Sequence, residues 1–441
     1  MGLPPETNAR CQNRTKTGND KEDIQMAGKM KILVVGGGAS GMMAAITAAR
    51  YGADVTILEH NDRLGKKLLV TGNGKCNFTN LKISADYYYS DSKDEQIDAV
   101  LSQCGVQNVL DLFLELGILP KEKRGMIYPY SEQASAVLDV LRFQVASMNI
   151  RVRLEEQISS IAYNGKFSVT TNHEHLTTDR LILACGSKAA PKTGSDGSGY
   201  AYAQQFGHSI VPVVPALVQL YGDHKMFREV AGVRCDASIT LLVNEEECAC
   251  ERGELQLTDY GLSGIPIFQI SRVASKALYR NNRVQASIHF LPDYTPDTIF
   301  QLLTKRAVQH SDYTLEQLLI GIFPKKLGNA LIKSFGWSVN TKAMTCKASE
   351  WKSFSEFICS VKIPIVGTKG FDCGQVCAGG VSLHEVSMHS LESKLQKGLY
   401  FAGEILDVDG ICGGYNLHWA WASGITAGKH AASDHPIDTL I

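Results

Sequence analysis

The segment that begins at Lys31 constrains the fold of this chain more than any other. It reads KILVVGGGASGMMAAITAARYGADVTILEH, which is an apolar β-branched run, a glycine cluster, an alanine-rich stretch of helical length and a second strand-like run, VTIL. This order predicts a strand–helix–strand unit of a parallel sheet. The glycines have the spacing GxGxxG between strand and helix, and Glu59 ends the second strand 18 residues after Gly41.

The glycine motif predicts a binding site for a dinucleotide. Gly36 allows the tight turn, Gly38 lets backbone N–H groups approach a pyrophosphate at the positive helix N-terminus, and Gly41 allows close helix–strand packing. Glu59 is placed to accept hydrogen bonds from ribose hydroxyls. The alternative is a tight turn that binds nothing, which the strand, the helix and the acidic residue together disfavour. The predicted fold class is therefore α/β, with a Rossmann-like domain built on a parallel sheet.

A second glycine-rich segment, near the C-terminal end, indicates which dinucleotide is bound. A buried strand-like run ends in Gly403 and Glu404, and a Gly-Gly turn at 413–414 then opens a helical pattern over Asn416–Ala432. The Glu404 carboxylate could bond a ribityl chain, and the positive end of the helix could stabilise an anionic reduced flavin. FAD fits this pattern better than a nicotinamide cofactor alone. The alternative is a second glycine turn with a surface carboxylate.

Composition bounds the class of protein and its partners. With 441 residues, a hydrophobic fraction of 44% and a charged fraction of 20%, the chain is predicted to fold into two or three domains. Because Lys plus Arg (44) balance Asp plus Glu (45), no bulk field favours nucleic acid or an acidic membrane, and neither is expected as a partner. The polar segment 1–29 is expected to be a flexible extension without a signal peptide.

The cysteines indicate a reduced, cytoplasmic protein. The twelve cysteines are irregularly spaced and form no CxxC pair, so neither a disulfide framework nor a redox-active disulfide at a flavin is expected. The segments HSDYTLEQ and VSLHEV contain no paired metal-ligand spacing, so no metal is expected.

Five segments together resemble a bacterial flavoprotein family that includes enzymes described as aminoacetone oxidases and a bile-acid dienone reductase of BaiN type. The segments are GGGASGMMAA, GKKLLVTGNGKCNFTN, ACGSKAAPKTGSDGSGY, LTDYGLSGIPIFQIS, and AGGVSLHEV continuing to GLYFAGEILDVDGICGGYNLHWAWASG. The resemblance implies a glutathione-reductase-like FAD domain interrupted by a β-barrel-like domain and a helical insert. A mainly β composition from about residue 208 and a helical one from Thr295 agree with it. We expect the FAD domain at 30–205 and 365–441, the barrel at 206–294 and 343–364, and the helical insert at 295–342.

The resemblance also assigns expected roles to individual residues by matching position. The residues expected to bind the pyrophosphate are Gly36, Gly38, Ala39, Ser40 and Gly41, and Glu59 is expected to bind the adenosine ribose. The loop expected beside the flavin ring and the pyrophosphate is Lys67, Thr71, Gly72, Asn73, Gly74, Lys75 and Cys76. The residues expected beside the ribityl chain and the flavin ring are Gly403, Glu404, Gly414, Tyr415, Asn416 and Leu417. Those expected at the adenine are Ile158, Ala184 and Gly186.

Two side chains are candidates for catalysis. His418 stands where the family pattern has Gln, in the first turn of the helix aimed at the flavin, and could donate a proton near flavin N1. Its alternative is a neutral histidine that satisfies a local hydrogen bond. Cys76 could lie near the flavin, although a lone thiol in a glycine loop more often serves packing.

The predicted activity is that of an FAD-dependent oxidoreductase with hydride transfer through flavin N5. No second GxGxxG is present, so NADH or NADPH would enter the substrate cleft directly as a transient electron donor. Reduction of a conjugated enone or similar small molecule is favoured, and a flavin oxidase of a small amine or alcohol is the first alternative. A flavin-containing module that binds nucleic acid or protein is the second. Substrate identity and oligomeric state stay open.

Overall fold

The centre of the fold is a five-stranded parallel sheet. The computed structural model describes residues 29–91 and 95–433, so the extension expected at 1–29 lies outside the described residues except for Lys29. The strand order is β20-β11-β1-β2-β7, which places the motif strand in the middle and confirms the predicted α/β class. The strands are β1 (Lys31–Val35), β2 (Asp54–Leu58), β7 (Arg151–Arg153), β11 (Arg180–Leu183) and β20 (Leu399–Phe401).

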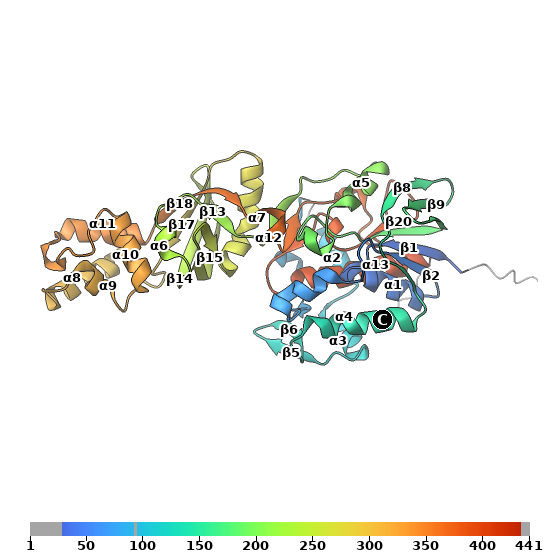
Figure 1. Cartoon of the computed structure of the whole chain (residues 1–441), viewed down its shortest axis with the longest axis horizontal. Coiled ribbons are helices and arrows are strands. Elements are labelled where there is room, and N and C mark those ends of the chain that lie inside the picture. Colours follow the sequence, from blue (N-terminus) through green and yellow to red (C-terminus); the bar gives the residue numbers. More distant parts are fainter. Residues whose placement is uncertain (1–28, 92–94, 434–441) are drawn as a thin grey trace, which may run out of the picture.

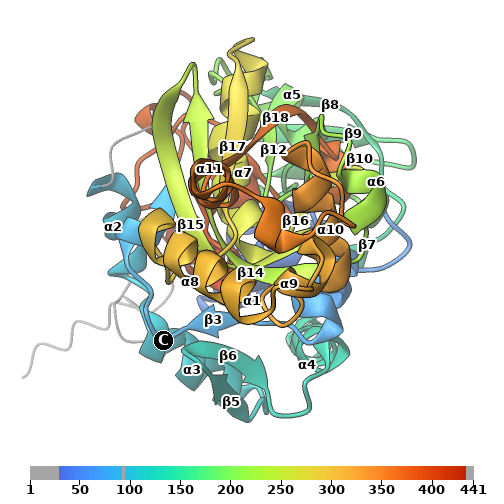
Figure 2. The same cartoon turned by 90° about the vertical axis from the view of Figure 1, so that its left-hand side faces the viewer.

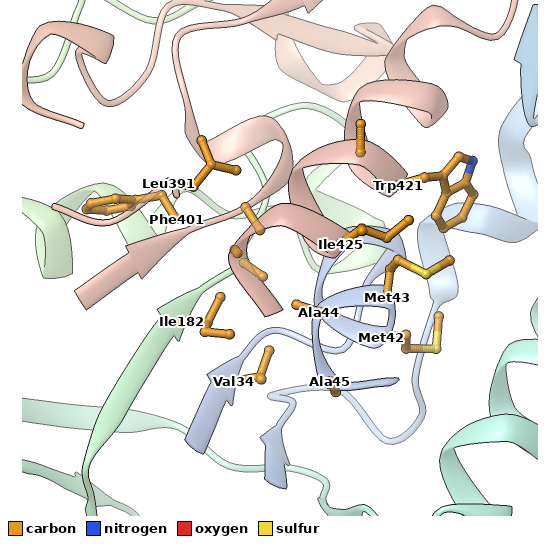
Figure 3. Close-up of a cluster of buried hydrophobic side chains, with 14 of the residues drawn as sticks. Val34, Met42, Met43, Ala44, Ala45, Ile182, Leu391, Phe401, Trp421 and Ile425 are labelled. Atoms are coloured by element: carbon orange, nitrogen blue, oxygen red, sulfur yellow. The ribbon is translucent and has the colours of Figure 1, made fainter. Parts of the chain in front are cut away.

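Two helices from opposite ends of the chain pack together on this sheet. The first, α1 (Ala39–Arg50), follows the glycine motif, and α13 (Tyr415–Ala432) follows the Gly-Gly turn. A Cβ atom at Gly428 would lie 2.3 Å from the Ala44 carbonyl oxygen, so the backbones approach closely at this point. Figure 3 shows Ile425 of α13 beside Met43 of α1. The core therefore joins sequence segments nearly 400 residues apart.

Smaller elements surround the sheet and complete this domain. A short 3-10 segment, η1 (Lys66–Gly74), follows β2, and a hairpin of β5 (Pro120–Lys123) and β6 (Met126–Pro129) pairs with β3 (Thr79–Asn80). The remaining elements are β4 (Tyr88–Tyr89), α2 (Glu95–Leu101), α3 (Val106–Glu115), α4 (Ala134–Ser147), β8 (Ile158–Tyr163), β9 (Phe167–Thr171), β10 (His175–Thr178), α5 (Ser198–Gln205) and β21 (Asp409–Gly410).

The middle of the chain forms a closed six-stranded barrel. Its strand order is β13-β16-β15-β14-β17-β18, and alternate residues of β14, such as Ala237, Ile239 and Leu241, fill its interior. The strands are β13 (Leu220–Gly222), β14 (Arg234–Val243), β15 (Glu246–Leu257), β16 (Gly261–Ser263), β17 (Val284–His289) and β18 (Val361–Thr368). Helix α7 (Ile265–Tyr279) packs against β15 and lies at the junction with the sheet domain (Figure 1).

A cluster of helices extends the barrel away from the sheet domain (Figure 1), and these helices lie nearest the viewer in Figure 2. It consists of α8 (Pro296–Gln309), α9 (Leu315–Leu319), α10 (Lys325–Ser334) and α11 (Ala348–Ile358), and a short helix, α6 (Phe227–Val230), packs against α10. Helix α11 lies inside the range 343–364 that the sequence analysis placed in the barrel. Trp351, Phe354 and Ile358 recur at helical spacing and are buried on one face, which explains why the segment is helical.

The barrel and the sheet domain are joined by paired strands and buried charges. Strand β12 (Val214–Ala216) runs antiparallel to β19 (Val376–Ala378), beside the short helix α12 (Gly370–Cys373). Arg272 of α7 donates from Nε to Asp409 Oδ1 at 2.9 Å, and Gln269 accepts the Cys412 N–H at 2.9 Å. Among the described residues, no helix combines the length and apolarity that a membrane-spanning helix requires.

Candidate cofactor and substrate cleft

A large cleft lies where the sheet domain meets the barrel. Its volume of about 1070 Å³ is at the upper end of the usual range for small-molecule sites. The glycine motif, η1, the β6 hairpin strand, the start of α13 and the start of α7 all contribute lining residues. The cleft therefore brings the two glycine segments, from opposite ends of the chain, together in one site.

The N-terminus of α1 opens into this cleft with its backbone N–H groups uncapped. Gly38 is the N-cap and no side chain accepts from the first turn, which also lacks acidic residues. Apart from its two chain neighbours, no atom of the described residues lies within 4 Å of a Cβ built at Gly38, so the space above this backbone is open to a ligand. Gly36 has a φ of +104°, and a Cβ there would lie 2.4 Å from the Ala184 carbonyl oxygen. An uncapped, open helix N-terminus is a favourable site for an anion.

Glu59 is held rigidly beside this turn. Its Oε2 accepts the Gly37 N–H at 2.8 Å, and its Oε1 accepts from the Asn61 backbone and side chain at 2.8 and 2.7 Å. The side chain is buried yet lines the cleft. Oε1 already accepts two hydrogen bonds, whereas Oε2 accepts one and has a further lone pair, so Glu59 can also accept from a ligand hydroxyl at Oε2.

The N-terminus of α13 is a second uncapped helix end at the cleft. Its N-cap, Gly414, has a φ of +97°, and the first turn has neither a side-chain cap nor an acidic residue. The Asn416 side chain anchors the turn by bonding both backbone groups of Gly410 at 2.8 Å. Close by, Asn77 lines the cleft with a buried Oδ1 that has no hydrogen-bond partner among the described residues. An unsatisfied buried acceptor of this kind is paired once a ligand donates to it.

The cleft that both helix N-termini border also contains an ion pair. Lys67 Nζ contacts Glu404 Oε2 at 2.6 Å, and the Ser187 hydroxyl donates to the same oxygen at 3.1 Å. Lys67 and Glu404 both line the cleft and keep about a fifth of their side chains exposed. The pair holds a cation for phosphate and an acceptor for hydroxyl groups at fixed positions.

These donors and acceptors fit FAD. Two positive helix ends and Lys67 suit a pyrophosphate and an anionic ring, whereas Glu59 and Glu404 suit sugar and ribityl hydroxyls. The open space at Gly38 and the unpaired Asn77 oxygen are the features of the structure that a bound ligand would complete.

Comparison with known proteins places the chain in a family. Residues 30–430 match the family described as HI0933-like protein Rossmann domain. This chain belongs to that family.

Relatives of this HI0933-like protein carry enzyme names. It is 42% identical over 405 residues to a 3-dehydro-bile acid delta(4,6)-reductase of Clostridium scindens. The aligned region covers 91% of this chain and 99% of the relative. It is 28% identical to a ribosomal RNA dihydrouridine synthase of Escherichia coli K12, with 89% and 95% covered. Among solved structures, a 3-ketosteroid-delta4-(5alpha)-dehydrogenase of Rhodococcus jostii RHA1 is 14% identical with a TM-score of 0.46, with 93% and 98% covered.

Most of the residues expected at the cofactor lie at this cleft of the HI0933-like protein. Those lining it are Gly36, Gly38, Ala39, Ser40, Glu59, Lys67, Thr71, Gly72, Asn73, Ile158, Ala184, Gly186, Glu404, Gly414, Asn416 and Leu417. Gly41, Gly74, Lys75, Cys76, Gly403 and Tyr415 do not line it. Gly41 instead serves packing, because a Cβ there would lie 1.8 Å from the Gly36 carbonyl oxygen.

His418 faces away from the cleft, so its expected role as a proton donor does not match its position. The ring is fully buried, with Nδ1 2.8 Å from the Thr79 hydroxyl and Nε2 3.2 Å from the Cys104 carbonyl. These partners suit a neutral ring that donates from Nε2 and accepts at Nδ1. Burial lowers the pKa of His418 from 6.5 to about 4. The structure thus agrees with the alternative reading, a histidine that satisfies local hydrogen bonds.

Cys76 is likewise buried behind the cleft wall. Its side chain has no exposed surface, and burial raises the pKa of the thiol to about 12. A neutral, buried thiol is unsuited to nucleophilic or redox chemistry. Among the described residues, no group of three or more His, Cys, Asp or Glu side chains could hold a metal ion.

Several lining residues were not expected from the sequence. Met126 and Tyr128 come from the hairpin strand β6, and Ile265 and Phe268 from the start of α7. The GLSGIPIF segment signals the last two, because two apolar residues three apart at a helix start share one face. Together the four form an apolar wall beside the glycine segments.

Proposed function

We propose that this protein is an FAD-dependent oxidoreductase that reduces a carbon–carbon double bond conjugated to a carbonyl, with NADH or NADPH as electron donor. The observation that carries the proposal is the single cleft onto which two uncapped helix N-termini, Lys67, Glu59 and Glu404 converge. The 42% identical relative, named as a reductase, supports the same direction of reaction.

Each element of the cleft has a defined task in this proposal. The α1 N-terminus and Lys67 would bind the pyrophosphate, Glu59 the adenosine ribose and Glu404 the ribityl chain. Ile158, Ala184 and Gly186 would contact the adenine end. The α13 N-terminus would stabilise negative charge on the pyrimidine side of the ring, and Asn77 would accept a hydrogen bond from a ring N–H. When bound, FAD supplies hydride acceptance and donation at N5.

The net reaction is balanced by one hydride and one proton. NAD(P)H gives up a hydride and becomes NAD(P)+, and the substrate double bond takes up one hydride and one proton to become a single bond. The apolar wall formed by Met126, Tyr128, Ile265 and Phe268 would hold the carbon skeleton of the substrate and keep water from the reacting bond.

Anaerobic reduction of the purified holoprotein tests the proposal. Addition of NADH or NADPH should bleach the flavin absorption, and a 3-keto-4,6-diene steroid should then restore it with formation of a product that has one carbon–carbon double bond fewer. A flavin that neither nicotinamide bleaches, but that a small amine or alcohol reduces and oxygen reoxidises, would instead favour an amine or alcohol oxidase.

RNA is the second candidate substrate. The relative named as a ribosomal RNA dihydrouridine synthase suggests it, since the uridine double bond that is lost in dihydrouridine is also conjugated to a carbonyl. The same cleft chemistry would then act on a base instead of a ring system in a free small molecule. Detection of dihydrouridine in RNA incubated with the holoprotein and NADPH, without steroid turnover, would select this candidate.

A further inference from the structure

The β5–β6 hairpin presents a positively charged face at the edge of the cleft. Lys121 pairs across the hairpin with Tyr128, and Lys123 with Met126, so these four side chains share one face. Met126 and Tyr128 line the cleft. Ile127, on the opposite face, is buried in the core. The two lysines therefore lie on the side of the hairpin that borders the cleft.

A third lysine joins them around a single carboxylate. Glu132 Oε1 contacts Lys121 Nζ at 2.6 Å and Lys123 Nζ at 2.7 Å, and its Oε2 contacts Lys75 Nζ at 3.2 Å. Three ammonium groups on one carboxylate leave two positive charges in excess. The lysine side chains are 34–52% exposed, so a phosphate can reach them and compete with Glu132 for their N–H groups.

Aromatic rings flank the cluster. Lys121 Nζ lies 5.3 Å from the centre of the Tyr130 ring, and Lys123 Nζ lies 6.0 Å from that of Tyr128. Tyr130 is 62% exposed, and its flat face is therefore available to a nucleobase. The combination of excess positive charge and accessible rings suits a phosphorylated nucleotide.

We propose that Lys75, Lys121 and Lys123 bind the 2′-phosphate of NADPH, so that the protein uses NADPH in preference to NADH. This rests on the proposed function, in which a nicotinamide nucleotide enters the cleft directly. A phosphate monoester carries a charge of about −1.5 to −2 at neutral pH and matches the excess of the cluster. The site lies at the rim, which agrees with the adenosine end of the donor lying far from its reacting ring.

Titration of the holoprotein with NADP+ and NAD+ tests the site directly, because the two ligands differ only in the 2′-phosphate. Wild-type protein should bind NADP+ at least about tenfold more tightly than NAD+, as expected for charge-assisted bonds to phosphate. In Lys121→Gln/Lys123→Gln, the NADP+ affinity should fall about tenfold or more while the NAD+ affinity stays within about twofold. Lys333→Gln, an exposed lysine in a single ion pair with Glu229 on the distant helices, should change neither.

Glu132→Gln separates binding from a merely structural role. Removal of this carboxylate frees the three ammonium groups and should leave NADP+ affinity unchanged or raise it, whereas a structural role of the cluster predicts a loss. Equal binding of NADP+ and NAD+ by the wild type, or an unaltered preference in the double variant, overturns the proposal. Binding of single-stranded RNA that requires the lysines, with no NADP+ preference, also overturns it.

Failure of the proposed function gives a different result. If NADP+ binding depends on the lysines but NADPH does not bleach the flavin, the phosphate site stands and the assigned electron donor is wrong.

Discussion

Replacement of Gly38 by Ala should weaken FAD binding without harming the fold. Gly38 has a φ of −78° and a ψ of −166°, which alanine adopts without strain, and its added Cβ would meet no atom within 4 Å. The Cβ would instead occupy the space through which the α1 backbone approaches a phosphate. Loss of one charge-assisted hydrogen bond costs about 1.5–3 kcal/mol, so the FAD dissociation constant should rise about 10- to 150-fold.

Gly105 provides a matched control for this substitution. It is the N-cap of α3 with a φ of −78° and a ψ of −178°, its Cβ would meet nothing closer than 3.7 Å, and it does not line the cleft. In both variants the entropic gain of about 0.4–1 kcal/mol from Gly→Ala is offset by a poorer N-cap, so the two free energies of unfolding should stay near that of wild type.

The assay is flavin fluorescence titration of deflavinated protein, combined with urea unfolding of each variant. Gly38→Ala should bind FAD weakly and Gly105→Ala should bind it as wild type does. Gly41→Ala should instead lose stability, because its Cβ would collide with backbone. Wild-type FAD affinity in Gly38→Ala would refute the placement of the pyrophosphate at this turn.

Three further predictions concern buried titratable groups. Burial lowers the folded-state pKa of His418 from 6.5 to about 4, so its contribution to stability, at most about 3 kcal/mol, is present above pH 6.5 and lost as pH falls toward 4. Urea unfolding at several pH values should show this loss in the wild type and not in His418→Gln. The rate of flavin reduction in His418→Gln should keep the pH profile of the wild type. Burial raises the pKa of Asp409 from 3.8 to about 7 despite the Arg272 contact, so its contribution to stability is present below pH 3.8 and lost as pH rises through 7; an unchanged pH slope of stability in Asp409→Asn would contradict this. Cys76 should resist alkylation by iodoacetamide at pH 8 in the folded protein, whereas the exposed Cys373 should react, as mass spectrometry of the labelled peptides can show.

The parts of the fold set by local patterns could be predicted from the sequence. The glycine motif and the continuous apolar runs on either side of it predicted the parallel sheet and α1, since both are local patterns in the sequence. Helix α11 was missed because the range 343–364 was assigned as a whole to the barrel, to which only its end, in strand β18, belongs. The hairpin of β5 and β6 was missed because its lysine-rich strand lacks apolar alternation.

The orientation of side chains around a helix could be predicted only in part. Asn416, Leu417 and Ala420 line the cleft, and at about 100° per residue His418 points about 200° away from Asn416. Helical spacing alone therefore directs His418 to the opposite face, where Thr79 and Cys104 satisfy it. The cluster of Lys75, Lys121 and Lys123, in contrast, forms because the fold brings Lys75 close to the β5–β6 hairpin, and no local sequence pattern predicts that approach.

The visible absorption spectrum of the purified protein, recorded before and after anaerobic addition of NADPH, tests the central claim most directly. The account predicts flavin bands that bleach on addition of NADPH and return with a conjugated enone. A colourless protein that takes up no added FAD would contradict the assignment of the cleft as a flavin site.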